Sequence, residues 1–280
     1  MPDCARPSIP DPAAWQASLR LRFADDGGTT RLTERDHRGP LRVQKPLYPE
    51  GPGICHAIMI HPPGGIVGGD QLRIDATAAP SAHALLTSPG AAKWYRANGN
   101  ISRQHVRLNV EAGAAIEWLP QETIFFNAAH VRMKHEVELA ADARYIGSEI
   151  LCFGRRASGE RFERGLIAQR TSIRLGGKLV WWEQGTLHGG GSAMHSVFGL
   201  DGASVCATLI GVGTPVPGAL LASMRAIDPL LAVTQIKSVV SARLLCADSE
   251  RARAVMTRVW QTLRPHLLGC EATVPRIWHT

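Results

Sequence analysis

A weak internal repeat with a period of about 30 residues constrains the fold of this chain more than any other feature. Three segments align with one another, namely IDATAAPSAHALLTSPG, VRLNVEAGAAIEWLPQE and VELAADARYIGSEIL. Each has the pattern of a strand, a turn of small residues and a second, more apolar strand. Because one strand pair cannot bury its apolar face alone, such pairs must stack. The repeat predicts stacked or layered sheets with β-helix-like strand repeats, and an ordinary β-sandwich meander is the alternative.

Helix patterns are concentrated after about residue 215, whereas strand patterns dominate the first two-thirds of the chain. The turns of the repeat are expected at residues 79–82, 111–114 and 140–143. Two segments near the C-terminus combine apolar residues at helical spacing with start and stop signals, PGALLASMRAIDP and DSERARAVMTRVWQTLRPHL. A β-like stretch separates them. We expect a mainly β fold with two α-helices in the C-terminal third, forming a single domain over residues 1–280.

Composition excludes several classes of protein. The formal charge of +7 predicts acidic partners, but the arginines are scattered and no aromatic-basic module is present, so no nucleic acid is expected. No segment has the roughly 20 apolar residues needed to span a membrane. The six cysteines form no C-x-x-C pair, which favours reduced thiols and a cytoplasmic protein.

The segment HAIMIHPPGGIVGGD, residues 56–70, contains the most unusual local pattern. It is not a phosphate loop, because Asp70 and Gln71 stand where Lys and Ser or Thr are required. Cys55, His56 and His61 cannot chelate one ion among themselves if residues 54–60 form a strand. Two glycine pairs are expected to form a tight structural turn, Gly64, Gly65, Gly68 and Gly69. Within it Asp70 is the functional candidate, and His61 is interpreted as its structural neighbour.

Three glutamates lie inside strongly apolar, strand-like segments: Glu122, Glu149 and Glu183. An isolated charge in such a setting is costly unless it is paired, hydrogen-bonded or hydrated. Two interpretations stay open. The glutamates either form local ion pairs with arginines or line a polar interior of hard oxygen ligands that a divalent cation visits.

Five motifs, in order along nearly the whole chain, resemble the urease accessory protein UreD family, called UreH in some lineages. They are HPPGGIVGGD, LLTSPGAAKWYR, EWLPQETIFF, GSEILCFGRRASGE and VWQTLRPHLLG followed by PRIW. The resemblance implies a protein without enzymatic activity that binds UreF, UreG and apo-urease and helps to insert nickel into urease. It also implies an internal route for a transient nickel ion, with no tightly bound cofactor.

The family positions on that route match Asp70, Glu149 and Glu183. We add His61 and Glu122 as candidates from the residue patterns above. The apolar C-terminal residues are predicted to bind UreF: Pro275, Arg276, Ile277 and Trp278. Two alternatives remain, namely a metal-dependent hydrolase using His61 and Asp70, and a structural adaptor that does not contact metal.

Overall fold

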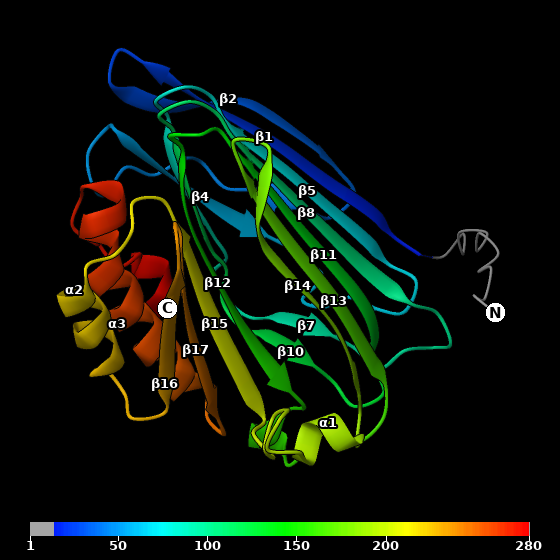
Figure 1. The fold of residues 1–280 in the computed structure, drawn as a ribbon. Coiled ribbons are helices and arrows are strands. Elements are labelled where there is room, and N and C mark those ends of the chain that lie inside the picture. Colours follow the sequence, from blue (N-terminus) through cyan, green and yellow to red (C-terminus); the bar gives the residue numbers. More distant parts are fainter. Residues whose placement is uncertain (1–13, 280) are drawn as a thin grey trace.

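The repeat forms a coil in which consecutive strands alternate between two stacked sheets. The computed structural model describes residues 14–279. Strands β5 (Gln71–Ala78), β8 (Ser102–Val110) and β11 (His130–Leu139) lie in one sheet, and β6 (His83–Thr87), β9 (Ala115–Leu119) and β12 (Arg144–Phe153) lie in the other. Neighbouring strands of this set are parallel within each sheet. The predicted stacked sheets with β-helix-like repeats are confirmed (Figure 1).

The first sheet has seven strands in the order β14-β13-β11-β8-β5-β1-β2. Its other members are β1 (Gln16–Asp26), β2 (Thr29–Arg38), β13 (Leu166–Leu175) and β14 (Lys178–His188). The outermost pairs, β1 with β2 and β13 with β14, are antiparallel hairpins. This sheet is therefore a parallel centre closed on each side by a hairpin.

The second sheet has ten strands, with the main order β16-β17-β15-β12-β9-β6-β4-β3. Its other members are β3 (Arg42–Val43), β4 (Ile54–Ile60), β7 (Ala92–Trp94), β10 (Thr123–Phe125), β15 (Val205–Val212), β16 (Leu231–Ile236) and β17 (Val239–Cys246). The short β10 pairs with both β12 and β7 outside this order. The β-like stretch expected between the two predicted helices is the β16–β17 hairpin.

The three predicted turns of the repeat occur where expected and stack on one another. The amide of Ser81 donates to the carbonyl of Ala112 at 3.0 Å, and the amide of Ala140 donates to that of Val110 at 2.8 Å. Each turn also closes on itself, as in the 3.1 Å bond from Ala143 to the carbonyl of Ala140. Small residues are required because each turn packs directly on the next.

Helices α2 (Gly218–Arg225) and α3 (Ser249–Leu268) are the two predicted in the C-terminal third. The Asp248 carboxylate accepts the amide of Glu250 at the start of α3, and Gly269 ends the helix with φ +72°. Sequence patterns missed α1 (Ser192–His195), because four residues show no helical period. Single 3₁₀ turns lie at Arg156–Ser158 and Arg276–His279. No helix of residues 14–279 has the length and apolar content needed to cross a membrane.

Two apolar cores result, one between the sheets and one between the ten-stranded sheet and the helices. Leu19, Leu86 and Val137 are buried in the first core, and Leu209 and Leu263 in the second. Figure 1 shows α2 and α3 on the outer face of the ten-stranded sheet, away from the seven-stranded one. Strand β12 separates the cores, so side chains that alternate along it face either the inter-sheet space or α3.

Candidate functional site

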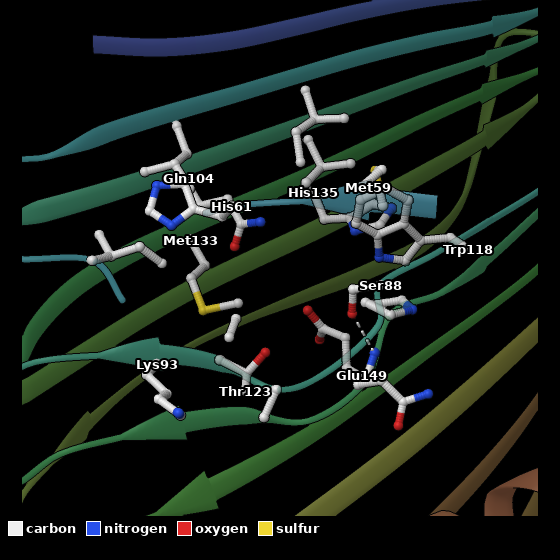
Figure 2. A pocket seen from close by; sticks show the side chains of 18 of the residues that line it. Met59, His61, Ser88, Lys93, Gln104, Trp118, Thr123, Met133, His135 and Glu149 are labelled. Atoms are coloured by element: carbon white, nitrogen blue, oxygen red, sulfur yellow. Dashed lines mark hydrogen bonds between the residues drawn. The ribbon is translucent and has the colours of Figure 1, made fainter. Parts of the chain in front are cut away.

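A cavity of about 240 Å³ lies between the two sheets. Its wall combines apolar side chains with imidazole, amide, hydroxyl and carboxylate groups, as Figure 2 shows. The seven-stranded sheet contributes Met133 and His135 of β11, and the ten-stranded sheet contributes Trp118 of β9 and Glu149 of β12. The cavity is therefore mixed in polarity, which suits water and a small polar or ionic guest.

The glycine turn borders this cavity, because His61, Gly64 and Gly65 belong to its wall. Gly64 and Gly69 have φ values of +78° and +98°, a conformation that other residues rarely adopt. Gly65 and Gly68 are required for close approach instead. A Cβ on Gly65 would lie 2.2 Å from the Tyr95 ring, and one on Gly68 would lie 3.0 Å from a backbone nitrogen. The expected tight turn is present, and its second role is to pack against the segment that follows β7.

Asp70 ends the turn as a buried anchor for backbone groups. Its carboxylate accepts the amide of Val67 at 3.0 Å and the amide of Trp15 at 2.9 Å. These bonds close the turn and tie it to the residue that precedes β1. His61 is half-buried, and burial lowers its pKa although the charge of Asp70 acts in the opposite direction. The pair is electrostatically coupled, but both oxygens of Asp70 already hold backbone donors.

Among the acids singled out from the sequence, Glu149 is the one that lines both cavities between the sheets. Its carboxylate accepts a short hydrogen bond from the side-chain amide of Gln169 on β13. Among residues 14–279, no cationic side chain lies within ion-pair distance of it. Burial raises the pKa of Glu149 to about 7, and the charge of Glu183 adds to this rise, while the Gln169 hydrogen bond and Arg243 oppose it. This carboxylate is thus poised between its neutral and charged forms.

A second, smaller cavity of about 60 Å³ adjoins the first and also contains Glu149 in its wall. The two cavities share five wall residues: Trp118, His135, Glu149, Gln169 and Thr171. Glu183 lines only the smaller one. There it forms a 2.7 Å ion pair with Arg243 of β17, and both side chains are substantially exposed. The structure therefore brings Glu149 and Glu183 to one place, with Glu183 on the solvent side.

His135 completes the shared wall as a neutral imidazole. Burial lowers its pKa to about 4, and the nearby His105 adds to that effect. Its Nε2 atom lies 3.3 Å from the hydroxyl of Tyr145. At neutral pH the cavity thus offers an uncharged nitrogen base close to an acid of raised pKa.

Glu122 lies apart from this group. Its buried carboxylate forms an ion pair with Arg253 on α3, although its neighbours Gln121 and Thr123 line the larger cavity. Of the three glutamates in apolar strands, Glu122 and Glu183 therefore form ion pairs with arginines. Glu149 lines a polar interior without such a pair.

The C-terminal residues pack on the molecule. The indole N–H of Trp278 donates to the hydroxyl of Thr87 at 2.8 Å, and its ring lies 5.8 Å from that of Trp260 on α3. Pro275 is buried, and Arg276 is exposed. Only part of the predicted UreF-binding segment is therefore available to a partner in this conformation.

Sequence reasoning missed a buried ionic cluster beneath α3, which we call the α3 cluster. It consists of Glu50, His56, His83, Glu117, Trp260 and Arg264. The guanidinium of Arg264 donates to both oxygens of Glu117, at 2.9 to 3.1 Å, and to the carboxylate of Glu50. The indole of Trp260 donates to Glu117 at 2.6 Å. Two features could have identified it: Glu117 interrupts the apolar strand AIEWL, and Arg264 follows Trp260 by one helical turn on the apolar face of α3.

Neither place resembles a tight metal centre. Within residues 14–279 no group of three or more His, Cys, Asp or Glu residues is arranged to hold a metal ion. Five cysteines of this range are free thiols, and Cys4 lies outside the described residues.

Comparisons with known proteins agree along almost the whole chain. A family model described as UreD urease accessory protein matches residues 16–279. The urease accessory protein UreD of Janthinobacterium sp. (strain Marseille) is 62% identical over 271 residues, which cover 95% of this chain and 92% of that protein. The UreD proteins of Nitrosospira multiformis and Azoarcus sp. are 53% and 48% identical over 272 and 269 residues, covering 95% of this chain and 98% and 94% of their own lengths.

Proposed function

The chain belongs to the family of UreD urease accessory proteins, and from this premise we propose that it helps to insert nickel into urease. Family membership supports a role in urease maturation. In the finer proposal the protein is a scaffold without chemistry of its own, which binds UreF, UreG and apo-urease in the cytoplasm. Nickel is its transient cargo, and it passes between the two sheets.

One observation carries the proposed route: Glu149 belongs to the wall of both inter-sheet cavities. A path from one cavity to the other passes this carboxylate. Because its pKa is raised to about 7 and no cationic side chain pairs with it within residues 14–279, a passing dication would supply the missing positive charge. The ion would favour the charged form of Glu149 and displace its proton.

The surrounding groups support transit better than storage. Nickel bound by a full set of nitrogen and sulfur ligands would be released slowly, whereas one carboxylate, a neutral imidazole and water hold it weakly. The groups available near the shared wall are Glu149, His135 and, toward solvent, Glu183. A hydrolase using His61 and Asp70 is less well supported, because both oxygens of Asp70 accept backbone amides.

The decisive experiment is Glu149→Gln assayed for nickel-dependent activation of urease with UreF, UreG and apo-urease. Glu138→Gln is the matched control, since it makes the same substitution at an exposed acid on the outer face of β11. We expect the yield of active urease to fall about tenfold with Glu149→Gln and to stay within about twofold with Glu138→Gln. Complexes should form normally with both variants.

Two results would redirect the proposal. Normal activation with Glu149→Gln combined with Glu183→Gln would show that the route does not depend on these acids. Loss of complex formation instead would assign the acids a structural role and favour the adaptor. Asp70→Asn should be assayed separately, because it alters the anchor of the turn as well as a charge.

The predicted contact with UreF needs a test that leaves the C-terminal packing intact. Deleting residues 275–280 also removes Trp278 from Trp260, and residue 280 lies outside the described range. Arg276→Ala changes an exposed side chain of the same segment. Weaker binding to UreF in a titration with Arg276→Ala would support the interface, and unchanged binding would remove Arg276 from it.

A further inference from the structure

The outer face of the seven-stranded sheet carries an uneven distribution of charge. Alternate residues of its strands, such as Leu19, Ile74 and Val106, are buried toward the other sheet, so the residues between them face outward. Figure 1 shows α2 and α3 on the opposite side of the molecule and α1 at the lower end, and no helix of the described residues crosses the outer face of this sheet. Its side chains are therefore available to a partner.

The strand register places outward residues in rows that cross the sheet. One row, from β2 to β14, reads Arg38, Ser18, Arg73, His105, Lys134, Arg170 and Gln184. Four of these seven residues are Arg or Lys, and none is acidic. The row before it adds Arg103 and Arg132, which are direct neighbours on β8 and β11. We call these two rows the basic belt.

Ion pairs compensate only part of the belt. Arg73 pairs with Asp75, and Lys134 and His105 both approach Glu136. Within the described residues, no carboxylate lies within ion-pair distance of the other four cations, Arg38, Arg103, Arg132 and Arg170. Instead, the guanidinium of Arg170 lies 5.6 Å from the ring centre of Trp182, whose side chain is exposed on edge strand β14. Four arginines without a carboxylate partner thus lie on one half of this face, in a chain whose formal net charge is +7.

The next row along the strands has a different character. It reads Asp36, Arg20, Asp75, Arg107, Glu136, Ser172 and Trp182. Acidic and basic residues alternate there, at a distance of roughly 7 Å from the belt along each strand. This row would repel the phosphates of nucleic acid or of a lipid surface laid across the sheet. A folded protein can instead present carboxylates to the belt and mixed charges to the adjoining row.

We propose that the basic belt is a docking surface for an acidic protein surface, with Trp182 as an aromatic anchor at its edge. Charge complementarity favours this partner. The unpaired arginines would bind carboxylates of the partner, and the row of alternating charges would set its orientation. The inference goes beyond nickel transit, because the belt side chains alternate with the buried residues of the same strands and face outward. Lys134 and Arg170 also border the larger cavity, whereas Arg103 and Arg132 line neither cavity. It holds or fails independently of the proposed route.

The test uses the full chain and a decaglutamate peptide as the acidic probe. Charge reversal by Arg103→Glu with Arg132→Glu, two belt residues that line neither cavity, should weaken binding about tenfold at about 50 mM salt. The matched control, Arg174→Glu with Arg258→Glu, changes the net charge equally outside the belt and should weaken binding less than about twofold. Equal weakening in both double variants would overturn the proposal, since binding would then follow net charge alone.

Two further probes decide the class of partner. A short DNA duplex and vesicles containing phosphatidylserine should each bind more weakly than decaglutamate at the same charge concentration. Both are wide enough to lay phosphates over the carboxylates of the adjoining row, whereas a single peptide chain can follow the belt alone. Tighter binding of either one would overturn the choice of a protein partner. Thermal unfolding controls for the fold, and Arg103→Gln with Arg132→Gln replaces the reversal if that variant unfolds.

Discussion

Glu117 of β9 and Glu149 of β12 lie on neighbouring strands, the first fully buried and the second partly buried beside two cavities, and their pKa values move in opposite directions. Burial alone raises the pKa of each. For Glu117, the hydrogen bond with His83 and the guanidinium of Arg264 outweigh burial and lower the pKa to about 2. For Glu149, only an amide donates directly, and the pKa rises to about 7.

The two glutamates represent two different environments for a carboxylate in one fold, the α3 cluster and the inter-sheet space. In the α3 cluster, cations and donors surround the carboxylates, so the charges are fixed and hold the helix to the sheet. In the inter-sheet space, compensation is left incomplete beside a cavity, so the charge can respond to a guest. The first region holds its charges in place, and the proposed ion route uses the second. The following predictions test this division from the largest expected effect to the smallest.

Arg264→Met should have the largest effect, because it leaves Glu117 and Glu50 buried without their main cation. We expect the free energy of unfolding to fall by about 3–5 kcal/mol. Urea denaturation at neutral pH measures this loss. Arg243→Met, which removes an exposed pairing partner, is the control and should cost no more than about 1 kcal/mol. Similar losses in the two variants would remove the distinction between the regions.

Gly211→Ala tests how tightly α3 packs against the ten-stranded sheet. A Cβ on Gly211 would lie 2.7 Å from Leu267 and 2.8 Å from Leu263, both on α3. We expect a loss of about 1–3 kcal/mol in the free energy of unfolding. The control variant is Gly185→Ala on edge strand β14, where a Cβ would meet no atom within 4 Å. Its melting temperature should stay close to that of the unaltered protein, and a comparable drop there would contradict the difference in packing.

Glu149→Gln should stabilise the protein in a way that depends on pH. A raised folded pKa means that the folded state holds the proton more tightly than the unfolded state, so Glu149 costs stability as pH rises from about 4.5 to about 7. The glutamine variant should be more stable by about 1 kcal/mol at pH 8, and this advantage should vanish near pH 4.5. Thermal unfolding across this range provides the measurement. An advantage that is constant with pH would show that packing, not charge, causes it.

The β architecture could be predicted from the sequence because each strand–turn–strand unit of the repeat is formed by residues that are adjacent in the chain. Small residues at 79–82, 111–114 and 140–143 mark turns that pack on one another, and strand patterns adjoin them. The site was harder to predict, because its partners are distant in sequence. Arg264 meets Glu117 across 147 positions, and Trp15 meets Asp70 across 55. An apolar strand shows that Glu117 needs a partner, but only the fold shows which one.

Distance in sequence between partners also explains why the three acids in apolar strands have different environments. Glu122, Glu149 and Glu183 look alike in sequence, yet their side chains meet Arg253, Gln169 and Arg243. Which face of a strand points to α3 and which to the other sheet depends on the stacking of the sheets. Local sequence therefore identified acids in apolar strands, but only Glu122 among them is buried. The three-dimensional partners decide which of them is paired with a cation.

The smallest effect is expected for the ion pair between Glu183 and Arg243, which lies at the solvent side of the smaller cavity. Both side chains are more than a third exposed, so water and salt screen their attraction. A double-mutant cycle with Glu183→Gln and Arg243→Gln should give a coupling energy below about 1 kcal/mol, which decreases further at high salt. The proposed route requires this pair to open so that a hydrated ion reaches Glu149, which a weak pair allows. The α3 cluster cannot open without releasing the helix. A coupling energy that approaches the loss in Arg264→Met would mean that this side of the cavity is closed by a strong ion pair, and the division between a fixed and an exchangeable region would fail.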